Sequence, residues 1–224
     1  MSCNSHERLP TALSAISRRD AIFSGALVAA GLSAASHPAF AASARIKEYP
    51  GLEYLEPIYE LSLSVKALQS GIQDTAKWPL VQKRLDSFFR GGLVSERNYY
   101  GGLSFQYINT IKYDSSELKE YIQLDKDNRK TYMENTLNSL QALKDALALS
   151  NKEEIVFNAQ QADMNLDHWF SMIPMEDVKA VGRIFKEVRG ADIDRDGKLS
   201  ASELATLPED DGEVWKKRVA LVGE

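Results

Sequence analysis

Residues 192–203 carry oxygen-bearing side chains at regular spacing, in the order Asp-Ile-Asp-Arg-Asp-Gly-Lys-Leu-Ser-Ala-Ser-Glu. Three carboxylates, those of Asp192, Asp194 and Asp196, stand at alternate positions and can present oxygen atoms to a hard cation. Gly197 follows them and permits the sharp turn that would fold the chain around such an ion. These residue types therefore favour coordination of a divalent cation by oxygen ligands.

The spacing fits the twelve-residue EF-hand calcium loop position by position. In that pattern Lys198 contributes its backbone carbonyl, Ser200 acts through a water molecule, and Glu203 is the bidentate ligand at the last position. The predicted metal site comprises Asp192, Asp194, Asp196, Lys198, Ser200 and Glu203. Calcium is the expected ion, and the alternative is a loop that keeps this fold without binding one. EF-hands normally work in pairs and the sequence contains no second loop, so the expected affinity is weak, on the order of micromolar to millimolar.

Helices are expected on both sides of this loop. The segment before it, about 175–189, has apolar residues at helical spacing, and the helix after it is cut short by Pro208. A further short helix, about 211–221, can pack in place of a partner hand. Its acidic start, 209–213, is interpreted as a solvated helix N-terminus, and its basic run, 216–218, suits a helix C-terminus. Either run could instead contact a charged partner.

Upstream of this segment, apolar residues recur at helical spacing over four long stretches. The first stretch has Pro57 in its first turn. Its apolar face comprises Ile58, Leu61, Val65, Leu68 and Ile72. The second stretch begins at Pro79, is interrupted by Gly91-Gly92, and continues from a cap at Ser95 to about Tyr113.

The third and fourth stretches have recognisable ends. The third, about 126–149, is expected to be capped by Asp125. The fourth opens at Asn151, whose spacing to Glu154 is similar to a capping box, and it ends at Pro174. Alternating patterns typical of strands are nearly absent. The predicted fold is therefore all-α, an up-down four-helix bundle followed by a small helical domain with one EF-hand-like loop.

The N-terminal segment has the composition of an export signal. Paired arginines at 18 and 19 precede an apolar run over 21–35, and small residues at Ala39 and Ala41 form a cleavage site. The paired arginines indicate the twin-arginine route, which serves the bacterial periplasm and the thylakoid lumen. The apolar run of about 15 residues is shorter than the roughly 20 that a membrane span needs, so cleavage is favoured over a membrane anchor. The predicted organisation is an export signal over 1–41, the four-helix bundle over 42–174, and the EF-hand-like domain over 175–224.

Composition argues against several classes of protein. Lys plus Arg total 27 against 32 for Asp plus Glu, a net charge of −5, which disfavours nucleic-acid binding. After removal of the predicted signal the chain keeps no cysteine and one histidine, His168, which disfavours disulfides, thiol catalysis and the usual zinc sites. The sequence has no nucleophile elbow, phosphate loop or dinucleotide fingerprint. The prediction is a protein that is not an enzyme, and an exported helical enzyme that uses His168 is a weaker alternative.

Several stretches carry a resemblance to a known family. Lys77-Trp78-Pro79-Leu80, Tyr99-Tyr100 and the run from Phe105 to Asp114 resemble the second and third helical segments of PsbQ-like extrinsic proteins of photosystem II. The leucine-rich stretch 136–140 and a twin-arginine signal that ends Pro-Ala-Phe-Ala are also similar. The additional C-terminal segment is similar to that of the extra extrinsic subunit of diatoms and related red-lineage algae, which has a PsbQ-like bundle and a small C-terminal domain.

The resemblance implies a non-enzymatic subunit that docks on the oxygen-evolving complex, stabilises it, and supports water oxidation and the retention of calcium and chloride. Its partners would be the photosystem II core and the other extrinsic subunits on the lumenal side, without nucleic acid. It would lie in the chloroplast thylakoid lumen, peripheral to the membrane and not spanning it; the alternative location is the bacterial periplasm. The alternative function is an exported calcium-binding EF-hand module that acts on another partner.

Overall fold

The computed structural model describes residues 44–88 and 99–222. The chain falls into two units, Met1–Ala42 and Ser43–Glu224, and every described residue belongs to the second. The predicted export signal lies outside the described residues, as do the predicted interruption at Gly91-Gly92 and the predicted cap at Ser95.

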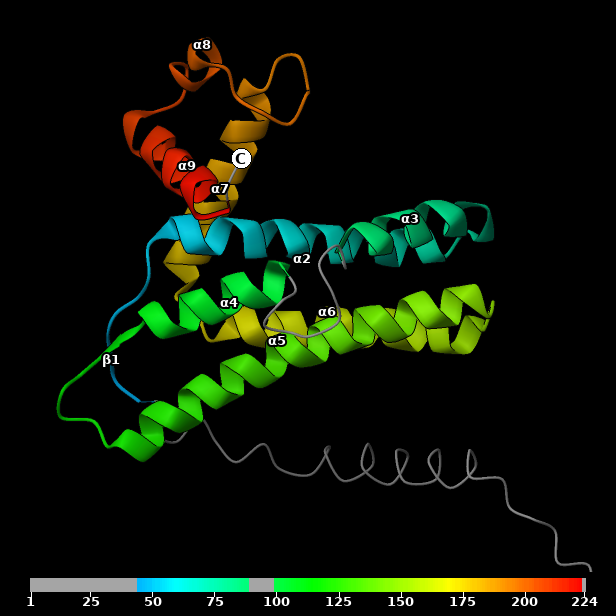
Figure 1. The fold of residues 1–224 in the computed structure, drawn as a ribbon, viewed down its shortest axis with the longest axis horizontal. Coiled ribbons are helices and arrows are strands. Elements are labelled where there is room, and N and C mark those ends of the chain that lie inside the picture. Colours follow the sequence, from blue (N-terminus) through cyan, green and yellow to red (C-terminus); the bar gives the residue numbers. More distant parts are fainter. Residues whose placement is uncertain (1–43, 89–98, 223–224) are drawn as a thin grey trace, which may run out of the picture. The chain divides into compact units, whose positions relative to one another are not determined.

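The described residues are mostly helical, which confirms the all-α class (Figure 1). The helices are α2 (Leu52–Ile72), the short 3-10 helix η1 (Thr75–Lys77), α3 (Trp78–Phe88), α4 (Tyr99–Thr110), α5 (Lys119–Ala148), α6 (Lys152–Ser171), α7 (Met175–Ala191), α8 (Ala201–Leu204) and α9 (Glu209–Val222). Two short strands, β1 (Ile46–Glu48) and β2 (Lys112–Tyr113), pair antiparallel.

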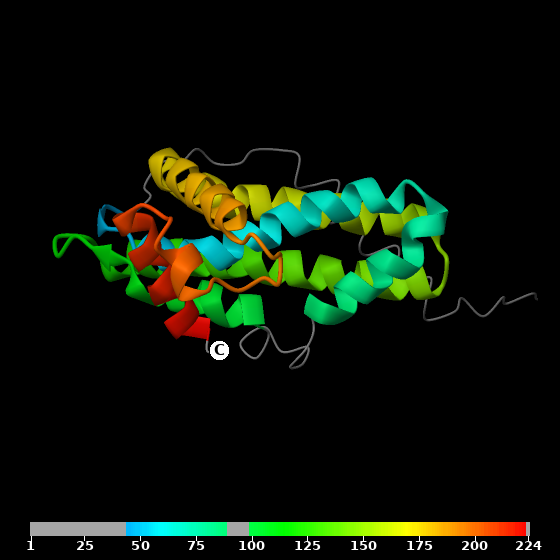
Figure 2. The same cartoon turned by 90° about the horizontal axis from the view of Figure 1, so that it is seen from above.

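The helices that correspond to the four predicted bundle members pack around a common apolar core, which also includes Val181 of α7, and their assignment as an up-down bundle stays a prediction (Figures 1 and 2). The long helices α5 and α6 pack along each other, α6 packs on α2, α2 packs on α4, and both α3 and α4 pack on α5. The apolar face predicted for the first helix is buried at all five positions, which confirms that part of the prediction. The second member consists of α3 and α4, and its continuity stays a prediction because residues 89–98 lie outside the described part.

Two predicted helix starts are wrong. The first helix begins at Leu52, so Pro57 lies within α2 rather than in its first turn. The third begins at Lys119 with Leu118 as its N-cap residue, and the expected cap Asp125 is buried inside α5. The first turns of α5 are largely exposed and carry no buried apolar stripe, so hydrophobic spacing could not reveal them.

Other local predictions agree with the structure. The side chain of Asn151 accepts a hydrogen bond from the Glu154 N–H and caps α6, as predicted. Pro174 follows α6 and is the N-cap residue of α7. The two-stranded sheet was not predicted, because its strands are two and three residues long and lie far apart in the sequence.

The C-terminal helices contact the bundle through α2. Both α7 and α9 pack against α2 (Figure 1). On α7, Gly182 allows this close approach, since a Cβ atom there would lie 2.8 Å from the hydroxyl oxygen of Tyr59. The ring of Tyr59 also meets that of Phe185 edge-on at 5.9 Å. Residues 175–222 therefore use α2 as their main support.

Among the described residues, no helix has both the length and the apolar character needed to cross a membrane.

Candidate metal centre

The predicted calcium loop lies between α7 and α8. Asp192 is the C-cap residue of α7, and its N–H donates to the carbonyl of Val188 at 3.2 Å. The backbone then turns through two residues with positive φ, Arg195 at 59° and Gly197 at 83°. Glycine adopts such a φ at no steric cost, which is the role predicted for Gly197. The turn brings the ends of the loop together.

The turn gathers the first three predicted ligands. One carboxylate oxygen from each of Asp192, Asp194 and Asp196 lies within 4.8 Å of the others. Oxygens bound to one calcium ion at 2.3–2.6 Å are at most about 5 Å apart, so a single ion can be shared by all three. Asp192 is half-buried, whereas Asp194 and Asp196 are exposed. The spacing and exposure suit a cation that enters from solvent.

Backbone N–H groups hold these carboxylates in place. The Asp196 N–H donates to Oδ1 of both Asp192 and Asp194 at 3.2 Å. The Gly197 N–H donates to Asp192 Oδ2 at 3.1 Å, and the Lys198 N–H donates to Asp196 Oδ1 at 2.7 Å. The loop is therefore ordered around its own N–H groups, and the carboxylates keep further lone pairs for a ligand.

Mutual repulsion of the carboxylates is visible at Asp194. The Asp196 N–H lowers the pKa of Asp194, but desolvation and the neighbouring charges of Asp196 and Glu203 act in the opposite direction, and the net pKa is raised. A bound cation would relieve this repulsion, because it would favour the charged form of each carboxylate.

The last predicted ligand, Glu203, does not join this cluster. It is 8% exposed, and its Oε2 accepts the N–H and the hydroxyl of Ser200 at 2.9 and 2.7 Å. Its Oε1 accepts the Ile193 N–H at 2.9 Å. These hydrogen bonds, that from the Ser200 hydroxyl first, lower the pKa of Glu203. The carboxylate closes the loop by joining its second residue to its ninth, and ligation by Glu203 stays a prediction.

Ser200 and Lys198 have structural roles in the loop, and their predicted part in ligation stays a prediction. Ser200 is the N-cap residue of α8, and it forms a reciprocal capping box with Glu203. Lys198 takes part through its N–H, whereas the prediction concerned its carbonyl oxygen. The structure thus brings together three of the six predicted ligands, and it uses Ser200 and Glu203 to start α8.

An ion pair that the sequence analysis missed joins the two helices flanking this region. Arg183 of α7 donates to both carboxylate oxygens of Asp211 on α9, with Nη2 to Oδ1 at 2.9 Å. The side chain of Asp211 is 2% exposed, and the hydrogen bonds from Arg183 lower its pKa. The interpretation of 209–213 as a solvated helix start is therefore wrong for Asp211, which clamps α9 to α7.

The basic run 216–218 also contains an ion-paired residue, Arg218, that the sequence did not predict. Arg218 lies near the middle of α9, not at its end, and pairs with Glu56 and Glu60 of α2. No local pattern marks this pairing, because the partners lie near opposite ends of the described chain.

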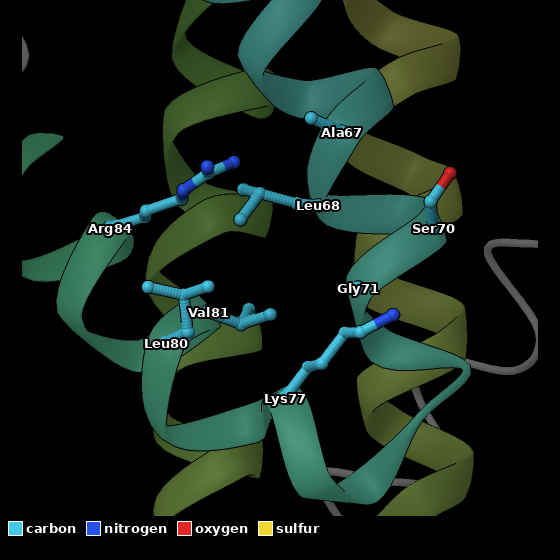
Figure 3. Close-up of a pocket in the computed structure, with 8 residues that line it drawn as sticks. All are labelled: Ala67, Leu68, Ser70, Gly71, Lys77, Leu80, Val81 and Arg84. Atoms are coloured by element: carbon cyan, nitrogen blue, oxygen red, sulfur yellow. The ribbon is translucent and has the colours of Figure 1, made fainter.

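A shallow groove lies between α2 and α3 (Figure 3). Buried Leu68 and Val81 line it, and Lys77 and Arg84 extend along it. Gly71 brings the helices close, since a Cβ atom there would lie 2.9 Å from Val81 Cγ2. Its volume, about 210 Å³, is below the roughly 300–1,000 Å³ typical of small-molecule sites.

His168, the residue on which an enzyme would depend, lies half-buried on α6. Its ring stacks on Tyr132 of α5, with the ring centres 5.3 Å apart and the planes inclined by 27°. This contact joins α5 and α6, which pack along each other.

Comparison with known proteins assigns no family: no family model, curated protein or solved structure matches this chain.

Proposed function

We propose that the protein is an extrinsic lumenal subunit of photosystem II that docks on the oxygen-evolving complex, stabilises it, and supports water oxidation and calcium and chloride retention. The observation that carries the proposal is the position of the PsbQ-like stretches. They fall at the start of α3, along α4 and in the middle of α5. Both α3 and α4 pack on α5 within an all-α body, and this arrangement supports the proposal.

An exposed apolar strip supports a docking role. Leu118, Tyr121 and Leu124, at the start of α5, are 60%, 41% and 53% exposed. They lie three residues apart along the helix, so they follow one side of it. Charged neighbours on the same two turns include Lys119, Glu120 and Asp127. Such a mixture of apolar anchors and surrounding charges is typical of a surface that binds another protein.

Salt washing and rebinding test this function. The native protein should co-purify with oxygen-evolving photosystem II cores, leave them in ~1 M salt, and restore oxygen evolution when residues 42–224 are added back, because rim charges are screened by salt. Rebinding should weaken when Leu118, Tyr121 and Leu124 are replaced by serine. Leu149→Ser is the matched control, since Leu149 is 77% exposed at the other end of α5. Absence from the cores at every salt concentration would exclude the proposal.

The second candidate is an exported calcium-binding module that acts on another partner. The observation that favours it is the cluster of Asp192, Asp194 and Asp196 oxygens within 4.8 Å. Calorimetric titration should give a dissociation constant on the order of micromolar to millimolar. Asp194→Asn should weaken binding at least about tenfold, and Asp210→Asn, at an exposed position on α9, should not. Calcium binding without association with photosystem II would favour this candidate over the first.

A further inference from the structure

A carboxylate is buried where α9 meets α2. Glu56 of α2 is 1% exposed, and Nε of Arg218 on α9 lies 2.8 Å from its Oε2. Nη2 of Arg218 donates to Glu60 Oε2 at 2.9 Å, one helical turn further along α2. The guanidinium also lies over the ring of Trp215, 4.6 Å from its centre. Arg218 thus joins α9 to α2 through two carboxylates.

Arg218 only partly replaces the solvation that the carboxylate of Glu56 loses on burial. Although Arg218 Nε is close, neither oxygen of Glu56 receives an aligned hydrogen bond from any described residue. Burial removes the water that would otherwise solvate the carboxylate, and one misaligned cation replaces only part of that solvation. The charged form of Glu56 is therefore costly while α9 is docked.

The titratable groups around Glu56 do not remove the free-energy cost of its charged form. On α2, Glu60 adds a second negative charge, and on α4 the phenols of Tyr99 and Tyr100 face the same region. Burial raises the pKa of Glu56 to about 7, although Arg218 acts to lower it. The other helices on α2 are η1, α3, α6 and α7, and among the described residues none of them carries a titratable group that shifts the pKa of Glu56.

We propose that Glu56 is an internal proton-binding site that controls how firmly α9 is held on the bundle. With the carboxyl group protonated, α9 is held, and Arg218 keeps its exposed partner Glu60. With the carboxylate charged, separation of α9 from α2 returns Glu56 to water and is favoured. The ligand of this site is a proton, and the site does not depend on the proposed function.

The direction of the pH effect follows from proton linkage. When α9 separates, the pKa of Glu56 returns toward its ordinary value of 4.5, so the docked state binds more protons between about 4.5 and 7. Docking is consequently strongest below pH 4.5 and is weakened as the pH rises through 7. A simple surface ion pair between glutamate and arginine would show the opposite trend, because acid would neutralise it.

The protonation state of Glu56 is also coupled to the loop 192–203 through α9. Asp211, on the same helix α9, is clamped to Arg183 of α7, the helix that leads into that loop. Loosening of α9 at its Arg218 end therefore acts on a helix that is tied to the carboxylate cluster.

Amide hydrogen exchange of the full chain tests the proposal. The exchange protection of the α9 amides should fall at least about tenfold between pH 5 and pH 8, because the pKa shift of Glu56 is more than one unit. The protection is corrected for the intrinsic pH dependence of exchange and is compared with that of the buried part of α5. Glu56→Gln should remove this dependence. Glu60→Gln is the matched control and should retain it. Equal dependence in wild type and Glu56→Gln, or no dependence in wild type, would overturn the proposal.

A direct titration covers the case in which Glu56→Gln fails to fold. In full-length protein with ¹³C-labelled glutamate carboxyl groups, one glutamate signal should titrate near pH 7, far from the ordinary glutamate value. If every glutamate titrates below about pH 5.5, Glu56 is not a proton-binding site at neutral pH.

Discussion

Asp125–Arg129 and Glu56–Arg218, two acid–arginine pairs of the described residues with a buried acid, differ in how well the acid is satisfied. Asp125 on α5 accepts hydrogen bonds from Arg129 Nε at 2.8 Å and from the Tyr113 hydroxyl at 2.7 Å. Glu56 on α2 lies as close to Arg218 but receives no aligned hydrogen bond among the described residues. The first pair has donors that replace water, and the second does not.

This difference follows from which helices carry the two partners of each pair. Asp125 and Arg129 belong to one helix and are four residues apart, so the helix itself sets their geometry. Glu56 and Arg218 belong to different helices, and their alignment depends on how α9 docks. The geometry of the Glu56–Arg218 pair therefore changes when α9 moves, whereas the geometry of the Asp125–Arg129 pair is held within one helix.

The largest expected effect is loss of the Asp125 pair. Asp125→Leu leaves Arg129, which is 2% exposed, as an unpaired buried cation, and it removes the acceptor of the Tyr113 hydroxyl. Breaking one side of a buried pair should lower the free energy of unfolding by about 3–5 kcal/mol. Urea denaturation measures this change. Asp127→Leu, at an exposed position on α5, is the control and should cost less than about 1 kcal/mol.

Neutralising Glu56 should have the opposite sign. Because its pKa is raised to about 7 in the folded protein, the wild type should lose stability as the pH rises from 4.5 through 7, on the order of 3 kcal/mol in all. Glu56→Gln should be more stable than the wild type at pH 8 and similar to it near pH 4.5. Urea denaturation at both pH values checks this. A Glu56→Gln protein that is less stable at pH 8 would place the Glu56 pair in the same class as the Asp125 pair.

Calcium should produce a smaller stabilisation through the loop. An ion that binds only the folded protein at ten times its dissociation constant adds about 1.4 kcal/mol to the free energy of unfolding. The thermal midpoint should therefore rise with calcium and return when a chelator is added. Asp196→Asn should abolish the rise. An equal rise in Asp196→Asn would mean that calcium acts elsewhere on the protein.

The sequence predicted the features that depend on near neighbours. The buried face of α2, the cap at Asn151 and the turn at Gly197 each follow from residues within one or two helical turns of one another. Glu203 shows the limit of local spacing. Its position in the motif is that of a ligand, but the same spacing from Ser200 also makes a capping box, which is present in the structure, and ligation stays a prediction.

Features that depend on distant residues were missed for a physical reason. Asp211 and Arg218 resemble solvent-exposed charges on a short amphipathic helix, and only their ion pairs with Arg183 of α7 and with the glutamates of α2 distinguish them. Asp125 was mistaken for a cap because a buried charge breaks the apolar pattern in the same way as a helix end does. Spacing alone does not distinguish a paired charge from an exposed one.

The smallest expected effect concerns the competition between capping and ligation at Glu203. Ser200→Ala removes the hydroxyl that accepts the Glu203 N–H and donates to Oε2, and it should cost about 1 kcal/mol. The same change removes one of the two hydrogen bonds that Oε2 of Glu203 accepts and leaves the one from the N–H of residue 200, so calcium affinity should rise if that carboxylate can turn to join the cluster. Calorimetry compares Ser200→Ala with Ser202→Ala, which leaves the Ser200–Glu203 pair in place. If affinity falls together with stability, Glu203 supports the loop only through α8, and the three aspartates are the whole of the side-chain cation site.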